Sequence, residues 1–137
     1  MELKYGLISA DDHVQEHPKV WTARMSRQKW GDRIPHVARM ADGNDAWMVD
    51  GQRLSLPGVA VAGAAMADRV REPQRWDQVP RSVFSAPERL EAMDADGVDY
   101  SILYPSVSGL AAETFGKLDD ADLELACVEP YNDWLIE

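Results

Sequence analysis

The chain has 137 residues, of which 45% are hydrophobic and 28% are charged. This is enough apolar material for the core of one ordinary domain, and it excludes collagen-like and fully disordered classes. The 14 Lys and Arg residues against 24 Asp and Glu residues give a formal net charge of -10, so nucleic acid and anionic membrane surfaces are excluded as partners on charge.

Other features of the composition bear on where the chain works. The longest weakly polar run, residues 56–67, is shorter than the roughly 20 residues of a membrane-crossing helix, so we expect no membrane span. The N-terminus holds no apolar block of the length that a secretion signal uses. The single cysteine, Cys127, cannot form an internal disulfide and fits a reducing compartment, so the sequence predicts a cytoplasmic protein.

The first predicted element is a short buried strand. Residues 3–10 are rich in apolar and β-prone side chains and lead into Asp11, Asp12 and His13. The strand is therefore assigned to residues 1–13, with polar side chains at its end.

Residues 14–85 form the second predicted region, a long insertion. Prolines and Asp-Gly turn signals recur there, and neither a helical nor a strand period is sustained. Within it, Asp50-Gly51 separates two β-prone runs, so a hairpin is predicted over residues 46–54. Loops of this length are typically functional or disordered.

Regular order returns at residues 85–88, which read Ser-Ala-Pro-Glu. This is the spacing of a capping box with proline in the first turn, and Gly97 is a stop signal, so a helix is predicted over residues 85–96. The β-branched and aromatic residues that follow predict the second strand over residues 98–105.

The last predicted helix spans residues 119–136, has acidic residues at its start, and must be kinked or ended half-way by Pro130. It reaches the end of the chain without a C-cap glycine or a polar tail, as a chain cut between elements would. Strand, helix, strand, helix is an order that favours the parallel sheet of an α/β protein. Two strands do not form a sheet that stands alone, so we expect further strands from elsewhere.

The run Asp11-x-His13 carries the main chemical signal. Side chains two residues apart on a strand point to the same side, so a carboxylate and an imidazole reach one point in space. With a single cysteine, a metal here must use nitrogen and oxygen ligands, and this pair suits a divalent cation such as Zn, Mn or Fe. The motif is short, and a loop turn or a helix N-cap is the competing interpretation.

A wider pattern resembles a known family. Residues 8–18, which read ISADDHVQEHP with Trp21 just beyond, resemble the opening strand of the amidohydrolase-related metal-dependent hydrolases, a group that includes aminocarboxymuconate semialdehyde decarboxylase and aromatic acid decarboxylases. Further blocks match in the same order, namely residues 45–51, 88–99, 103–105 and 131–135. The resemblance covers nearly the whole chain, and collinear blocks are more specific than any one of them.

The resemblance implies the N-terminal portion of a (β/α)8 TIM barrel, with about two βα units and the long insertion after strand one. It also implies one divalent metal at the C-terminal ends of the barrel strands. Such proteins usually carry His-x-His in the first strand; here Asp11 stands where the first His is expected and His13 where the second is. A carboxylate in place of an imidazole favours harder ions, so Mn or Fe fits as well as Zn.

The remaining ligands of the family, a His from a middle strand and an Asp from the last strand, lie beyond residue 137. We therefore expect a second protein chain that supplies the rest of the barrel, unless the chain is a truncated product. Glu16, Trp21 and Tyr104 are candidates to orient a ligand or to meet substrate. The competing interpretations are a solvated turn acid for Glu16 and packing for Trp21, and no catalytic residue is assigned.

The predicted function is that of an N-terminal segment or subunit of a metal-dependent enzyme acting on a small molecule. The resemblance implies hydrolysis of an amide, ester or lactone, or non-oxidative decarboxylation of an aromatic acid. The alternative is a non-catalytic chain, truncated or partner-dependent, that contributes an interface. A lower alternative is oxidative chemistry at a Mn or Fe centre on the same scaffold.

Overall fold

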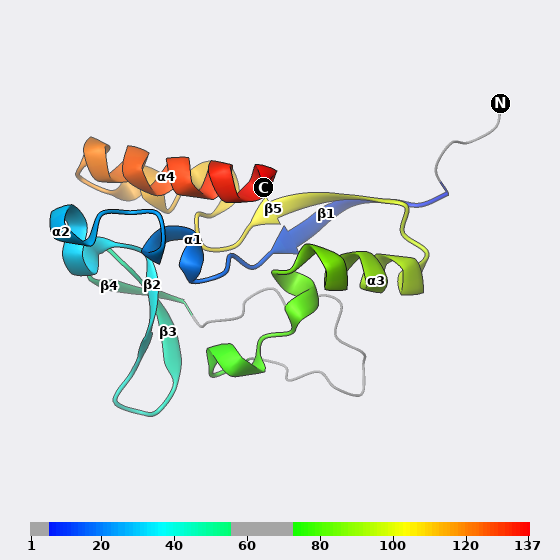
Figure 1. The fold of residues 1–137 in the computed structure, drawn as a ribbon, viewed down its shortest axis with the longest axis horizontal. Helices are drawn as coiled ribbons and strands as arrows, with labels where there is room; N and C mark the ends of the chain where they lie inside the picture. The colour runs from blue at the N-terminus through cyan, green and yellow to red at the C-terminus, as the bar shows by residue number, and fades with distance from the viewer. Residues whose placement is uncertain (1–5, 56–72) are drawn as a thin grey trace.

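The computed structural model describes residues 6–55 and 73–137, which form a mixed α/β structure with two separate sheets (Figure 1). Its strands and helices in chain order are β1 (Ile8–Val14), α1 (Lys19–Thr22), α2 (Arg27–Trp30), β2 (His36–Arg39), β3 (Asp45–Val49), β4 (Gln52–Ser55), α3 (Ala86–Asp96), β5 (Tyr100–Pro105) and α4 (Ala121–Ile136). Short 3-10 turns join them: η1 (Gly31–Arg33), η2 (Trp76–Gln78), η3 (Arg81–Val83), η4 (Leu110–Ala112) and η5 (Phe115–Lys117). The start of the predicted first strand, residues 1–5, and the apolar run 56–67 lie outside the described residues. Within the described ranges, no helix is both long and apolar enough to cross a membrane.

The first sheet pairs β1 with β5 in parallel, from Ile8 beside Tyr100 to Val14 beside Pro105. The predicted parallel sheet of an α/β protein is therefore confirmed. β1 begins at Ile8 and includes residues 11–13, because pairing with β5 continues as far as Val14. The polar triplet thus lies within the strand, and the strand ends one residue later than predicted.

One extra residue interrupts the register of β1. Ser9 pairs with Ser101 and Asp12 pairs with Leu103, so the segment from Ser9 to Asp12 is one residue longer than its partner on β5. This irregularity is a β-bulge, which bends a strand and re-aims its side chains. Side chains after the bulge therefore change face relative to an unbroken strand.

β5 begins at Tyr100, two residues after the predicted start at residue 98. Asp99 instead fastens the N-terminal end of the sheet through its side chain. Its carboxylate accepts the N–H groups of Gly6 and Leu7 at 2.7 and 3.1 Å, and its own N–H donates to the Leu7 carbonyl at 3.0 Å. These bonds replace ladder pairing at this end of the sheet.

The second sheet is antiparallel, in the order β2-β3-β4, and lies in the predicted insertion. The hairpin predicted over residues 46–54 is confirmed: β3 and β4 meet at Asp50 and Gly51, whose φ angles are 50° and 74°. Positive φ at both central residues is what a two-residue hairpin turn requires. The sequence did not predict β2, α1 and α2, because elements of four residues are too short to show a hydrophobic period.

α3 confirms the helix predicted over residues 85–96. It ends at Gly97, whose φ of 68° is the left-handed conformation that glycine adopts without strain. The expected capping box forms differently. The Ser85 hydroxyl donates to the Glu88 carboxylate and does not accept a backbone N–H of the first turn.

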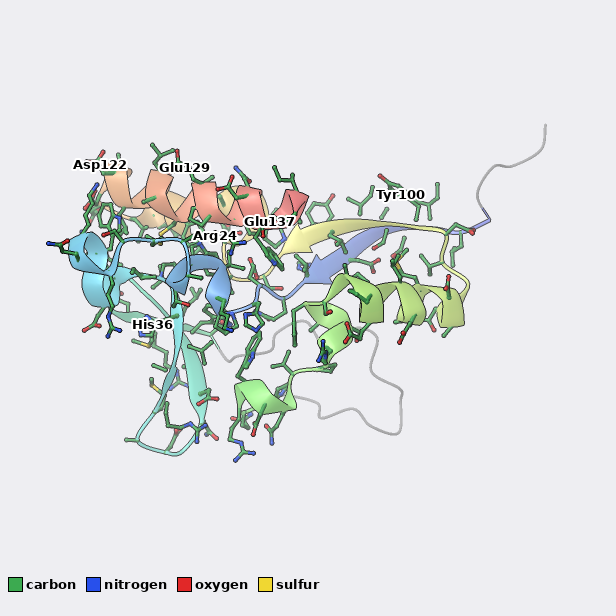
Figure 2. The ribbon with its side chains drawn as sticks, viewed as in Figure 1. Arg24, His36, Tyr100, Asp122, Glu129 and Glu137 are labelled. Carbon is green, nitrogen blue, oxygen red and sulfur yellow. The ribbon has the colours of Figure 1, made fainter. Side chains whose placement is uncertain are left out.

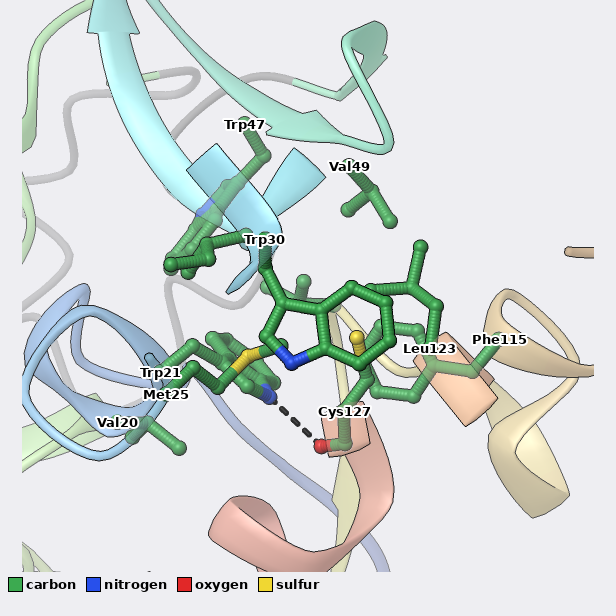
Figure 3. Packing of buried hydrophobic residues seen from close by; sticks show 11 residues of the cluster. Val20, Trp21, Met25, Trp30, Trp47, Val49, Phe115, Leu123 and Cys127 are labelled. Carbon is green, nitrogen blue, oxygen red and sulfur yellow. Dashed lines mark hydrogen bonds between the residues drawn. The ribbon is translucent and has the colours of Figure 1, made fainter. Parts of the chain in front are cut away.

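α4 confirms the helix predicted over residues 119–136, and the Asp120 carboxylate caps it by accepting two N–H groups of its first turn. Pro130 does not end the helix, which continues unbroken past it. In the turn before Pro130, the Cys127 carbonyl accepts a hydrogen bond of 2.8 Å from the Trp21 indole (Figure 3). This bond ties α4 to the insertion in the turn before the proline.

The hydrophobic core lies between the insertion and α4, and not between the parallel strands and α3. Trp21 meets Trp47 and Phe115 edge to face, with ring centroids 5.6 and 5.8 Å apart, a favourable arrangement of aromatic rings (Figure 3). The buried cluster comprises Val20, Trp21, Met25, Trp30, Ile34, Trp47, Val49, Val107, Phe115, Leu123 and Cys127. α3 contributes no buried residue to it. The insertion is thus a folded platform next to the parallel strands.

Candidate metal centre at the end of the parallel strands

The two faces of the β1-β5 sheet differ in what covers them. On one face, Asp12 accepts a hydrogen bond from Ser101 and lines a small hollow with Arg89 of α3. The other face is open. Tyr100 and Ile102 project from it with 53% and 43% of their surface exposed, and Figure 2 shows Tyr100 on the side away from α3.

The bulge places Asp11 and His13 on the open face. Asp12 is held on the α3 face, and the adjacent His13 points to the opposite side. Asp11 lies in the bulge, where it and Ala10 stand opposite Ile102 of the open face, and it is exposed. His13 pairs in register with Tyr104, and their rings lie 6.2 Å apart. Counting from Ile8, which pairs with Tyr100 on the open face, an unbroken β1 would bring Asp12 to that face and turn His13 towards α3.

The Asp11 carboxylate and the His13 imidazole suit a divalent cation. Both side chains are exposed, and neither makes a hydrogen bond or an ion pair with another described residue. They fit two positions of a nitrogen and oxygen site, whereas catalytic Zn sites have three protein ligands. Within residues 6–55 and 73–137, no group of three or more His, Cys, Asp or Glu side chains is placed to hold a metal. By itself the pair offers two donors, fewer than the protein ligands of a catalytic Zn site.

Glu16 is fully buried where the segments after β1 and β5 meet. Its carboxylate accepts the N–H of Val107 at 2.9 and 3.0 Å and the N–H groups of Ser106 and Ser108 at 3.2 Å each. Glu16 is therefore not a solvated turn acid. It fastens the segment that follows the candidate ligands to the segment that follows β5.

Other hydrogen bonds hold the end of β1, and the sequence did not predict them. The Arg89 guanidinium donates to the His13 carbonyl at 2.7 Å, and the Ser106 hydroxyl donates to the Val14 carbonyl at 2.9 Å. The sequence indicated a role for Glu16, because this residue stands three positions after His13 in the pattern Asp-x-His-x-x-Glu. It gave no indication for Arg89, because the partner of Arg89 is a backbone carbonyl 76 residues away.

The electrostatics at this end of the sheet follow from burial. Burial raises the pKa of Glu16 above its ordinary value of 4.5, and the N–H donors from Val107, Ser108 and Ser106 oppose that rise. Burial raises the pKa of Tyr131 to about 12, and the charge of Glu16 contributes. Burial lowers the pKa of Arg89, which the Asp12 carboxylate opposes.

The remaining predicted site residues fall in different places. Tyr104 is half-buried and lies beside His13, at the same end of the sheet. Trp21 is completely buried in the core, where its role is packing. Ser106 and Ser108 follow β5, and both donate to Glu16 through the backbone.

Comparison with known proteins gives one kind of match. No family model matches the chain, and no curated protein matches its sequence. Its structure is similar to that of an amidohydrolase from Mycobacterium avium subsp. paratuberculosis K-10, with a TM-score of 0.62 and 18% sequence identity over 98% of this chain. The chain has the fold of part of an amidohydrolase. It spans 38% of that amidohydrolase's length.

Proposed function

We propose that this chain is the N-terminal part of a metal-dependent enzyme of the amidohydrolase fold, in which Asp11 and His13 provide two ligands to one divalent cation. The observation that carries the proposal is the pair itself. A carboxylate and an imidazole share the open face at the C-terminal end of a parallel strand, and neither side chain makes a hydrogen bond or an ion pair with another described residue.

The proposal includes a (β/α)8 barrel in which β1 and β5 are the first two strands. Support comes from the match to 38% of an amidohydrolase and from the open face, where Ile8, Tyr100 and Ile102 are each more than 40% exposed. In such a barrel this face would be the packed interior, and the C-terminal strand ends would carry the active site. The remaining units would come from further sequence or from a second chain.

A divalent cation at this position supplies Lewis-acid activation of a carbonyl group or of water. Asp11 offers a hard anionic oxygen and His13 a nitrogen, a donor set compatible with Mn, Fe or Zn. Tyr104, beside His13, would contact a small-molecule substrate at the same end of the sheet. The substrate classes that we propose are an amide, ester or lactone for hydrolysis, and an aromatic acid for decarboxylation.

The test uses the assembly that this chain forms in its own host, isolated through a tag on the chain. Native mass spectrometry gives the subunit masses, and elemental analysis gives the metal bound per chain. We expect a barrel-completing partner or a longer chain, with Mn, Fe or Zn bound. Asp11→Ala and His13→Ala should each lower metal occupancy at least about ten-fold, since even partners of metal ligands affect affinity by 10–100-fold.

Asp12→Asn is the matched control for the Asp11 variant. Asp12 is the adjacent carboxylate on the α3 face, and an asparagine there still accepts the hydrogen bond from Ser101. Its metal content should equal that of the wild type. Unchanged metal in both Asp11→Ala and His13→Ala would refute the proposal.

A second candidate is an interface role without catalysis, which the incomplete ligand set in the described residues favours. Under this alternative the partner would keep full turnover and its own metal when this chain is removed. Oxidative chemistry at a Mn or Fe centre is the remaining option, and it would show as consumption of O2 during turnover.

A further inference from the structure

The end of β1 that carries His13 is held from two sides. On one side, the Glu16 carboxylate accepts three consecutive backbone N–H groups, from Ser106 to Ser108. On the other side, Arg89 of α3 donates to the His13 carbonyl at 2.7 Å. We call these two contacts the strand clamp, defined by Glu16 and Arg89.

The choice of a carboxylate at position 16 has a physical consequence. Burying an ionisable group is unfavourable unless hydrogen bonds satisfy it, and an apolar side chain of similar volume would fill the same space without that penalty. Three directional N–H bonds fix the relative position of two backbone segments, which apolar contact does not. Glu16 therefore specifies where the segment after β1 lies relative to the segment after β5.

The clamp leaves the His13 backbone little freedom. Its carbonyl is tied to α3 through Arg89, and the chain is tied again three residues later through Glu16. The Gln15 N–H, between them, donates to the Val83 carbonyl at 2.9 Å. The His13 side chain, in contrast, is exposed and makes no hydrogen bond with another described residue. The protein thus fixes the backbone and leaves the imidazole available.

We propose that Glu16 and Arg89 are positioning residues, which fix the His13 imidazole relative to the metal centre by holding the end of β1. The inference rests on the proposed function, since it assigns the clamp a role only if His13 binds a metal. Metal geometry is sensitive to ligand displacements of a few tenths of an ångström, so loss of the clamp should change both affinity and coordination.

The experiment uses the assembly from the host with its metal replaced by Co(II). The visible absorption of Co(II) reports coordination geometry, and competition with a chelator gives affinity. Glu16→Gln turns an amide N–H2 group towards the three N–H donors, so it should weaken Co(II) binding about 10–100-fold and alter the absorption bands. The matched control is Glu129→Gln, an exposed glutamate on α4 (Figure 2), which should leave both unchanged.

A second pair of variants tests the clamp from the α3 side. Arg89→Met keeps the aliphatic stem but removes the donor to His13, and it should weaken and distort Co(II) binding in the same way. Arg89→Lys restores a donor and should recover most of the wild-type spectrum. A purely structural role would lower stability in these variants without changing the spectrum of the folded assembly.

The outcomes separate the inference from the proposed function. A wild-type assembly that binds no Co(II) overturns the proposed function and the inference with it. A wild type that binds Co(II), with wild-type spectra and affinity in both Glu16→Gln and Arg89→Met, overturns the inference alone. If Glu16→Gln fails to assemble, a wild-type spectrum in Arg89→Met is sufficient to overturn it.

Discussion

Asp12 and His13 are neighbours on a strand, so their side chains lie on opposite faces of the parallel sheet. Asp12 accepts a hydrogen bond from the Ser101 hydroxyl on the α3 face, and His13 lies beside Tyr104 on the open face. The extra residue between Ser9 and Asp12 decides which of the two takes the open face. At the scale of the residue, the candidate site therefore depends on a change of strand register as much as on residue type.

Glu16 predicts a pH dependence of stability. Its pKa in the folded chain lies above the ordinary value of 4.5, so the stability that it contributes is fully present below that value and is lost as the pH rises through the folded pKa. Urea unfolding at a series of pH values should show the free energy of unfolding of the wild type falling, relative to Glu16→Gln, from pH 4.5 towards neutrality. The slope for one proton is at most about 1.4 kcal/mol per pH unit.

Glu129→Gln serves as the control for this pH series, because the Glu129 carboxyl is exposed on α4. It should keep the pH dependence of the wild type. A constant difference between the wild type and Glu16→Gln at every pH would contradict the assignment.

At the scale of the element, α3 has no buried residue, so interactions at its two ends and its contact with the sheet must stabilise it. At its N-terminus the Ser85 hydroxyl donates to the Glu88 carboxylate, and at its C-terminus Gly97 ends the helix. Arg89 then connects it to β1 through the His13 carbonyl. The helix predicted with the fullest set of signals in the sequence is thus the one least dependent on the core.

Gly97→Ala should destabilise the protein by about 1 kcal/mol, because a residue with a Cβ is unfavourable at a φ of 68°. A Cβ at this position would meet no atom within 4 Å, so the effect is conformational and not steric. Gly97→Asn is the matched variant, since asparagine tolerates the left-handed region, and it should lose about half as much. Thermal unfolding that ranks alanine equal to glycine would contradict this account.

At the scale of the whole molecule, the buried aromatic core lies to one side of the parallel strands. The insertion, the segment after β5 and α4 pack together, whereas one face of the β1-β5 sheet stays open (Figure 1). A two-stranded sheet is marginal by itself, and an exposed apolar face is typical of a surface that another part of a protein covers. The open face is the surface that the rest of the proposed barrel would cover.

In the proposed barrel, Ile102→Lys would place an unpaired charge in the packed interior, so it should prevent association with the segment proposed to complete the barrel. Ile102 is 43% exposed on the open face, so the change should leave the insertion core intact. Leu125→Lys, at a 57% exposed position on α4, is the control and should assemble normally. Native mass spectrometry of the two tagged variants compares them, and equal assembly of both would contradict the role of the open face.

The sequence by itself determined the local elements that have their own signals. The Asp50-Gly51 turn, the stop at Gly97 and the order of β1, α3, β5 and α4 depend on residues close together in the chain, and each was predicted. The Asp11-x-His13 pair was also visible, because two residues on one strand have a fixed spacing.

Only the tertiary structure decided how those elements are used. The bulge in β1 arises from pairing with a strand about 90 residues away, and Glu16 and Arg89 find their partners among backbone groups 91 and 76 residues distant. Backbone donors and acceptors are the same at every residue, so no sequence pattern marks which of them a side chain will meet. The sequence left Trp21 open between a substrate contact and packing, and the fold places it in the core, where its indole N–H donates to α4 in the turn before Pro130.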